Sequence, residues 1–183
     1  MKLIIASDIH GSAKWCRLLL DAVEHENADK LVLLGDLLYH GPRNDFPEEY
    51  APKEVFAMLN AVKEKITAVR GNCDSEVDQM VLEFPCLADF ALIDDNGRTL
   101  FLTHGHLFNT QNLPHLKKGD LLLNGHFHTP CFQELENGVF YANCGSTALP
   151  FHDTPHSYIV YENGELTFAD LETGGIFDCA LLP

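Results

Sequence analysis

The stretch KLIIASDIHG (residues 2–11) decides the fold that this sequence predicts. An apolar run of strand length ends at Asp8 and His10, and Gly11 provides a turn where a buried strand would reach the surface. Four later apolar runs end in the same way, with Asp36, Asn72, His104 and the pair His126 and His128. The carboxyl ends of strands in an open α/β sheet meet at one crevice, so these side chains are expected to gather around metal ions.

The first part of the chain alternates between predicted strands and helices. Residues 2–7, 30–34 and 66–69 are apolar runs of strand length. Residues 12–26 place apolar side chains on one helical face, and residues 52–65 predict a second helix behind a loop rich in glycine and proline. Strand, helix, strand units cross over right-handed, so the three strands should lie parallel in one sheet.

After Pro85 the pattern changes to hairpins. Asn-Gly pairs, which favour tight turns, separate strand-like runs at Asn96-Gly97, Asn137-Gly138 and Asn163-Gly164. The runs expected to pair are 87–93 with 99–103, 131–135 with 139–142, and 158–161 with 165–170. This much antiparallel strand predicts a second sheet. We therefore predict an α/β fold, a four-layer α/β/β/α sandwich with two stacked mixed β-sheets.

Composition narrows the function. The 183 residues, 46% of them hydrophobic, suit a single domain over residues 1–183. Lys plus Arg number 12 and Asp plus Glu 27, a net charge of −15 that opposes stable binding to nucleic acid or to an anionic membrane. A small anionic substrate stays compatible, because bound divalent cations would reverse the local potential.

The cysteines and the hydropathy pattern suggest a location. Six cysteines are scattered without a Cys-x-x-Cys pair, in a chain that begins with a core strand rather than a signal peptide. Reduced thiols in the cytoplasm are therefore expected, and no apolar run approaches the roughly 20 residues that span a bilayer.

Each polar motif alone has a simpler explanation. An Asp-x-His pair occurs in many loops, and Gly35-Asp36 and Gly71-Asn72 are typical turn sequences. His126 and His128 are more informative, because two imidazoles one residue apart can bind one ion or two adjacent ions. Seven metal-binding side chains at five strand ends, in an order that suits one crevice, indicate a two-metal hydrolytic centre.

The order Asp-x-His, Gly-Asp, Gly-Asn, His and Gly-His-x-His resembles the calcineurin-like metallophosphoesterase superfamily. Chain length and the sequence Gly71-Asn72-Cys73-Asp74 look most like its small bacterial YfcE-type phosphodiesterases. The resemblance implies the metallophosphoesterase fold and two divalent cations. It assigns one ion to Asp8, His10, Asp36 and His128, and the other to Asp36, Asn72, His104 and His126.

The same resemblance implies a reaction. Phosphodiesters would be hydrolysed by a hydroxide that bridges the two cations and is held by Asp36, without a protein nucleophile. Manganese is expected first, since the mixed oxygen and imidazole shell suits it and the family often prefers it; zinc, iron or nickel would fit the same shell. His106, two residues after His104, is expected to support the ligands rather than to bind metal.

One position departs from the commoner family pattern, in which a histidine after the Gly-Asn asparagine protonates the leaving group or binds the phosphate. Here it is Cys73, and a thiol has neither the positive charge nor a pKa near neutrality. Either another group supplies the proton, or the substrates have leaving groups that need little help. Asp74 is expected to pair with Arg70 or with a metal ligand. Cys73 is not a phosphatase nucleophile, because Gln79 stands where a Cys-x5-Arg loop needs arginine.

The candidates for substrate contact are Asn72, His40 and Cys73, while residues 43–46 either cover the site or face solvent. Two other functions stay open. A phosphomonoesterase would use the same centre, and an inactive scaffold would resemble the retromer subunit of this family. A scaffold is expected to have lost ligands, whereas all seven positions carry competent side chains. A small phosphodiester is the expected partner, and the strand edges would also suit a homo-oligomer.

Overall fold

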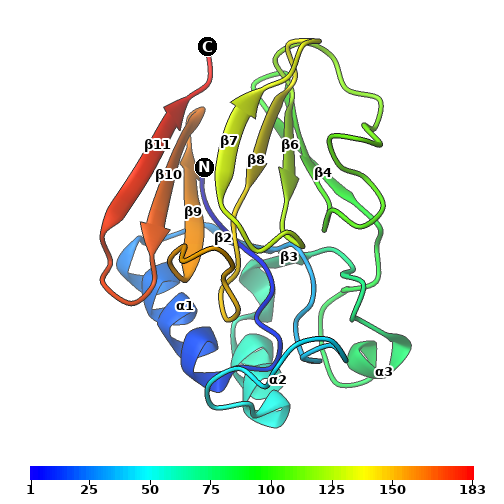
Figure 1. Cartoon of the computed structure of the whole chain (residues 1–183), viewed down its shortest axis with the longest axis vertical. Helices are drawn as coiled ribbons and strands as arrows, with labels where there is room; N and C mark the ends of the chain where they lie inside the picture. Colours follow the sequence, from blue (N-terminus) through cyan, green and yellow to red (C-terminus); the bar gives the residue numbers. More distant parts are fainter.

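The computed structural model describes residues 1–183 and contains two stacked β-sheets (Figure 1). The first sheet has the order β11 (Ile176–Leu181), β10 (Glu165–Asp170), β9 (Ser157–Glu162), β1 (Lys2–Ala6), β2 (Lys30–Leu33) and β3 (Ile66–Ala68). The second has the order β4 (Ala91–Asp95), β5 (Arg98–Leu102), β6 (Leu121–Asn124), β8 (Phe140–Asn143) and β7 (Cys131–Glu134).

Both sheets are mixed, as predicted. In the first sheet, β1, β2 and β3 are parallel, and β9 joins β1 in antiparallel register. In the second, β5, β6 and β8 are parallel and flanked by the antiparallel strands β4 and β7. The predicted α/β class with two stacked mixed sheets is therefore confirmed.

Two helices cover the outer face of the first sheet. Helix α1 (Ala13–His25) begins where the hydroxyl of Ser12 accepts the N–H of Trp15, and α2 (Pro52–Ala61) begins at a proline, which lacks the N–H that a first turn leaves unpaired. The second helix is shorter than predicted, because the chain tightens to a 3₁₀ turn at Lys63–Lys65. No helix has the length and hydrophobicity that crossing a bilayer requires.

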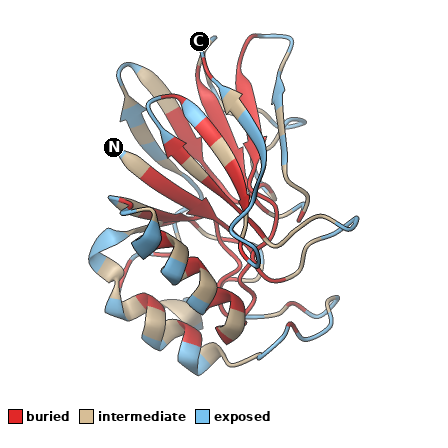
Figure 2. Ribbon diagram, turned by 90° about the vertical axis from the view of Figure 1, so that its left-hand side faces the viewer, coloured by how far each residue is buried: buried red, intermediate tan, exposed pale blue.

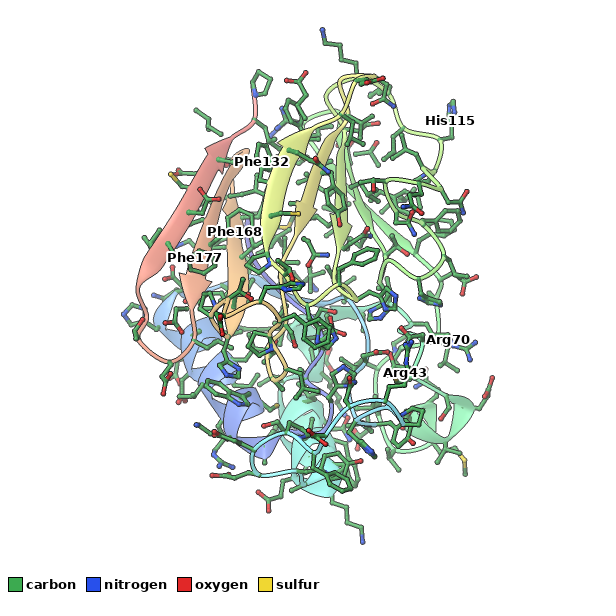
Figure 3. The ribbon with its side chains drawn as sticks, in the orientation of Figure 1. Arg43, Arg70, His115, Phe132, Phe168 and Phe177 are labelled. Atoms are coloured by element: carbon green, nitrogen blue, oxygen red, sulfur yellow. The ribbon has the colours of Figure 1, made fainter.

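Strand β1 is buried on both faces and therefore belongs to two cores. Ile4 and Ala6 pack with the helices, whereas Leu3 and Ile5 pack between the sheets. Alternate side chains of a strand point to opposite faces, which explains the continuous apolar run. Buried residues are concentrated at these two interfaces (Figure 2). Phe168 lies in the core between the sheets, and the partly buried Phe132 packs against this core (Figure 3).

The outer face of the second sheet lacks the helical layer that the four-layer prediction placed there. Residues 103–120 cover this face without a helix, and Phe108, Leu113 and Leu116 pack on its small apolar cluster. The segment turns at Asn109, whose side-chain oxygen accepts the backbone N–H groups of Gln111 and Asn112. Local side-chain hydrogen bonds of this kind compete with helix formation.

The three predicted hairpins are present, with one difference in turn geometry. Asn96-Gly97 and Asn163-Gly164 have positive φ at both positions, whereas at Asn137-Gly138 only the glycine does. Strand β4 begins at Ala91, later than predicted. The short helix α3 (Glu76–Gln79) and the edge strand β11 had no counterpart in the prediction.

Candidate metal centre

The loops that follow β1, β2, β3, β5 and β6 meet at one edge of the sandwich, where their backbones are tied together. The N–H of His10 donates to the carbonyl of Asp36 at 2.9 Å, and the N–H of Gly125 donates to the carbonyl of His104 at 2.9 Å. Strand ends that are 118 residues apart in sequence are thereby fixed side by side, because the N–H of His126 also donates to Asp8 Oδ2 at 2.9 Å.

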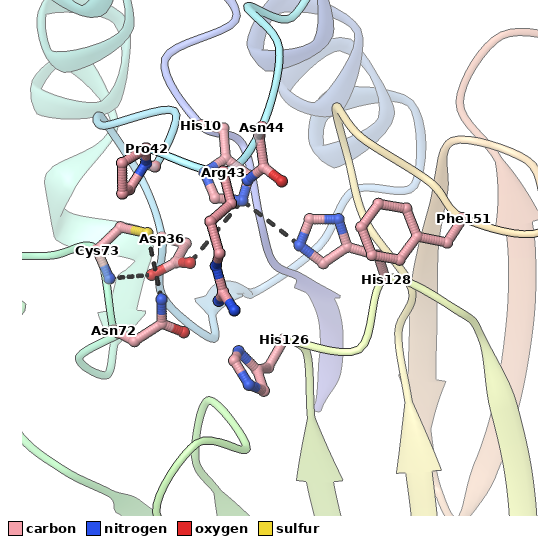
Figure 4. A pocket seen from close by; sticks show the side chains of 11 residues that line it. His10, Asp36, Pro42, Arg43, Asn44, Asn72, Cys73, His126, His128 and Phe151 are labelled. Carbon is pink, nitrogen blue, oxygen red and sulfur yellow. Dashed lines mark hydrogen bonds and ion pairs between the residues drawn. The ribbon is translucent and has the colours of Figure 1, made fainter.

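All seven predicted ligands converge there. Figure 4 shows five of them lining one pocket, namely His10, Asp36, Asn72, His126 and His128, and Asp8 and His104 lie directly behind, with ligand atoms close to those of the same residues. Asp8 Oδ1 lies 3.2 Å from His128 Nε2 and 3.5 Å from His10 Nε2. Asp36 Oδ2 lies 3.5 Å from His104 Nε2, which is 3.0 Å from Asn72 Oδ1. The imidazole of His126 lines the same pocket, which encloses about 350 Å³. It lies outside the three tight groups of ligand atoms, which are Asp8, His10 and His128; Asp8, Asp36 and His104; and His10, Asp36 and Cys73.

Three imidazoles are oriented by backbone carbonyl groups. Nδ1 of His10 lies 2.8 Å from the Tyr39 oxygen, that of His104 2.7 Å from the Leu34 oxygen, and that of His128 2.5 Å from the Leu149 oxygen. A carbonyl only accepts, so each Nδ1 carries a proton and each ring turns its Nε2 into the centre, where a neutral ring would offer a lone pair to a metal. This is the arrangement by which proteins hold histidine ligands to metals.

The atoms that face the centre are suited to bind cations. Nε2 of His10 and Nε2 of His128 lie only 3.5 Å apart, and the buried Asp8 Oδ1 has no hydrogen-bond donor. Buried lone pairs facing one another without a donor are unfavourable unless a cation lies between them. Carboxylate, amide and imidazole ligands together suit divalent metals of the first transition row.

The pKa values reflect the crowding of charge. Burial opposes ionisation of Asp8, but His104, His10 and His128 outweigh it and hold the pKa of that carboxyl well below its usual range. Burial also opposes protonation of His104, yet Asp8 and Asp36 raise its pKa to about 9. At His126, burial together with His104 outweighs the opposing effect of Asp8 and Asp36 and lowers its pKa to about 4.

The backbone at the centre is strained. Five of the seven ligand residues have positive φ, with values of 59° at Asp8, 47° at His10, 54° at Asp36, 65° at His126 and 56° at His128. Side chains other than glycine rarely adopt this region, and such residues gather at functional sites. Rigid packing behind the loops holds the ligands in place.

Two glycines allow the loops to approach closely. A Cβ atom on Gly71 would lie 2.1 Å from Asp36 Oδ1, and one on Gly125 would lie 2.0 Å from the hydroxyl of Ser7. The glycines before the ligands, which each have a simple explanation as turn residues, are therefore needed for steric reasons.

The residues after Asn72 fasten the central carboxylate. The N–H of Cys73 donates to Asp36 Oδ1 at 2.7 Å. The carboxyl of Asp74 accepts the backbone N–H groups of Asp36, Leu37 and Gly71. Of the two partners expected for Asp74, Arg70 or a predicted metal ligand, it therefore contacts the predicted ligand Asp36. Arg70 reaches only the Asp74 carbonyl, at 3.3 Å. Burial and Asp36 raise the pKa of Asp74 to about 6, against those three hydrogen bonds.

Two candidates for the site lie elsewhere. His40 does not line the pocket, because its ring packs against Tyr39, Phe46 and Tyr50. Arg43, from the same loop, lines the pocket instead. His106 does not line it either, and its ring lies 5.4 Å from that of His104, in line with a supporting role.

Phe151 is a pocket residue that sequence reasoning missed. Its ring stacks on His128 at 4.6 Å and is 45% exposed. It stands in a loop with no motif or periodicity, so no sequence signal identifies it.

A two-sheet α/β sandwich with this ligand set at one sheet edge defines a class of metal-dependent phosphoesterases. The family model described as calcineurin-like phosphoesterase superfamily domain matches residues 1–165. The chain belongs to this superfamily and is a hydrolase of phosphoric esters, whose family implies divalent metals.

Similar proteins agree with that class. Over 176 residues the chain is 46% identical to Phosphodiesterase YfcE of Escherichia coli (strain K12), covering 96% of this chain and 95% of that protein. The solved structure of YfcE, a phosphoesterase from E. coli, covers 100% of both chains with 44% identity and a TM-score of 0.97. Vps29 from Entamoeba histolytica, complexed with Zn²⁺, shares the fold at 20% identity and a TM-score of 0.62, covering 98% of this chain and 97% of that one.

Proposed function

We propose that this chain hydrolyses phosphodiesters with the help of two divalent cations. The observation that carries the proposal is that Nε2 of His10 and Nε2 of His128 face each other at 3.5 Å beside the buried Asp8 Oδ1, which has no hydrogen-bond donor. Asp8, His10, Asp36 and His128 would hold one ion, and Asp36, Asn72, His104 and His126 the other. Asp36 would be shared, which agrees with its place beside both His10 and His104.

When bound, the two ions would make a shared water acidic enough to attack phosphorus as hydroxide and would offset the charge on the phosphoryl oxygens. The protein orients this chemistry. Carbonyl groups fix three imidazoles, and the Cys73 N–H holds one oxygen of Asp36 so that the other faces the pocket. Burial raises the pKa of the Cys73 thiol, and Asp36 raises it further, so this side chain stays neutral and supplies neither a nucleophile nor a proton.

Manganese is the first expectation for the metal, with zinc, iron or nickel as alternatives that the same ligands accept. The negative charge of the chain favours a small phosphodiester over a nucleic acid, because a polyanion would be repelled outside the pocket. Six cysteines without a disulfide support a location in the cytoplasm.

The proposal is tested by metal analysis together with hydrolysis of bis(4-nitrophenyl) phosphate by the wild type, Asp36→Asn and the matched control Asp153→Asn, which changes an exposed carboxylate. We expect Asp36→Asn to lose tightly held metal and at least 10²-fold in turnover, because the shared negative charge is gone. Unchanged metal content and turnover in Asp36→Asn would rule out the assigned centre.

A phosphomonoesterase is the nearest alternative, and the ratio of rates on bis(4-nitrophenyl) phosphate and 4-nitrophenyl phosphate separates the two. The diester should be cleaved faster, because Arg43 is the only lysine or arginine that lines the pocket, so the second negative charge of a monoester would find no further cationic side chain. A scaffold without activity would show no hydrolysis after Mn²⁺ is added to metal-free protein. The complete ligand set argues against it.

A further inference from the structure

A second cavity adjoins the metal pocket. The two cavities share Pro42, Arg43, Asn72 and Cys73, which form the wall between them. The second cavity, called the outer pocket here, has a volume of about 640 Å³, within the range of sites for small organic groups. Its far wall consists of Tyr39, Ser75, Val77 and Asp78. A group bound there would reach the metal pocket without leaving the protein surface.

The far wall is apolar with one acidic edge. The Tyr39 side chain is 41% exposed and Val77 66% exposed, so both leave apolar surface open to solvent. Asp78 accepts the N–H of Ser75 through Oδ2 at 2.7 Å and adds the only carboxylate of the cavity. An aromatic face next to an aliphatic side chain favours a flat ring, and the carboxylate disfavours a second negative charge.

Arg43 is the only Lys or Arg that lines either cavity. It forms no ion pair, although the chain has 27 acidic residues. Figure 4 shows its side chain extending from the loop toward Asn72 and His126. An unpaired guanidinium at the junction of the two cavities is placed to bind an anionic oxygen that lies near the metals.

We propose that the outer pocket binds one of the two ester substituents of a phosphodiester and that this substituent is a neutral aromatic ring. Arg43 binds a phosphoryl oxygen of the same substrate. This proposal rests on the proposed function, since it names the substrate class of the same site. A phosphodiester carries one negative charge and two ester groups. Arg43, the one lysine or arginine of the two cavities, can pair with that charge beside the metals, while the outer pocket accommodates one of the ester groups. A substrate with a second phosphate in the outer pocket would be repelled by the Asp78 carboxylate.

The test measures binding rather than turnover. Dimethyl phosphate and methyl phenyl phosphate differ by one ring and are titrated into the Zn²⁺-loaded protein, with dissociation constants obtained from phosphorus NMR. We expect the ring to tighten binding about tenfold, which is typical of one aromatic stack. Tyr39→Ala and Val77→Asn should remove this advantage, and Val77→Asn should leave the dissociation constant of dimethyl phosphate unchanged. The change in Tyr39 spares its carbonyl, which holds His10.

Controls separate this outcome from general damage. Tyr39→Phe keeps the ring and should keep the tenfold advantage, and so should Met80→Asn, because Met80 is 82% exposed and lines neither cavity. Arg43→Gln should weaken both diesters equally, by about tenfold, because only the phosphate contact is lost.

Equal affinity of the wild type for the two diesters, or a ring advantage that survives in Tyr39→Ala and Val77→Asn, would overturn the proposal. The same holds if neither diester binds. Failure of the proposed function looks different: bis(4-nitrophenyl) phosphate would not be hydrolysed by the Mn²⁺-loaded wild type, whatever the binding constants of the two diesters.

Discussion

Asp74 accepts the backbone N–H of Asp36 at 2.8 Å, so a buried carboxyl behind the pocket positions the central carboxylate in front of it. The same carboxyl accepts N–H groups from Leu37 at 2.9 Å and from Gly71 at 2.7 Å. Two loops that follow different strands, β2 and β3, are thereby held by one side chain. The arrangement explains how Asp36 keeps a backbone φ of 54°.

Asp74→Asn should destabilise the protein by about 1–3 kcal/mol, because the amide nitrogen cannot accept and at least one buried N–H is left unpaired. Urea unfolding would measure the change. The matched control is Asp153→Asn, an exposed position with φ of 57° where asparagine is well tolerated. Equal midpoints for the two variants would show that the Asp74 hydrogen bonds contribute little.

Gly71→Ala should lower turnover about 10²-fold, because the new methyl group would lie 2.1 Å from Asp36 Oδ1 and must displace that carboxylate. Gly175→Ala is the control, since a Cβ atom there would lie 3.1 Å from the hydroxyl of the flexible Thr173 side chain and would meet no backbone atom that closely. Steady-state kinetics on an aryl diester would compare them. A Gly71→Ala enzyme with wild-type turnover would mean that the loop can move aside without cost.

Metal should stabilise the fold, because Asp8 and Asp36 are buried close together and the charge of Asp8 opposes the ionisation of Asp36. Mn²⁺ at a hundred times its dissociation constant should raise the free energy of unfolding by about 2.7 kcal/mol. For a chain of this length the melting temperature should rise by roughly 5–10 °C. Asp8→Asn should lose most of this rise, measured by calorimetry with and without chelator, whereas a rise of wild-type size in Asp8→Asn would contradict the assignment.

Much of the fold could be predicted because its signals are local. Apolar runs give the central strands, and Asn-Gly pairs give the three hairpins. Strand β11 gave no signal, since it is an edge strand whose residues are mostly exposed and so need no alternation. Helix α3 has only four residues, too few for a helical period to be recognised. The segment 103–120, which covers the second sheet without a helix, turns at Asn109 through side-chain hydrogen bonds that leave no periodic pattern in the sequence.

The candidate site also has parts that the sequence predicts and parts that it does not. The seven ligand types follow from motif spacing, and the structure brings them together. What spacing could not provide is backbone chemistry, since the carbonyl groups of Leu34, Tyr39 and Leu149 orient the imidazoles whatever their side chains are. Loop neighbours were equally out of reach, which is why Phe151 was missed.

Alkaline pH should destabilise the protein through its buried thiols. Burial raises the pKa of Cys16 from 9.0 to about 12, so between these values the unfolded chain has lost a proton that the folded chain keeps. The free energy of unfolding should therefore fall by about 1.4 kcal/mol per pH unit for this thiol, a contribution fully present below pH 9. Urea unfolding from pH 9 to 11 gives the slope of the unfolding free energy against pH. In Cys16→Ala this slope should be less steep by the contribution of one proton. Cys179→Ala, at an exposed position, should keep the wild-type slope.

Cys73→His should widen the range of leaving groups. The thiol lines the pocket in a neutral form, so an alkoxide leaving group receives no proton from it, whereas 4-nitrophenolate needs none. An imidazolium at this position would donate a proton or bind the phosphate, effects worth about 10²-fold or more in other enzymes. We expect the gain to be large for diesters with alkyl leaving groups and small for bis(4-nitrophenyl) phosphate.

Cys73→Ser is the control, because a hydroxyl is no better acid than the thiol. A gain of equal size for both leaving groups would point to phosphate binding alone, and no gain for either would show that proton donation does not limit the reaction.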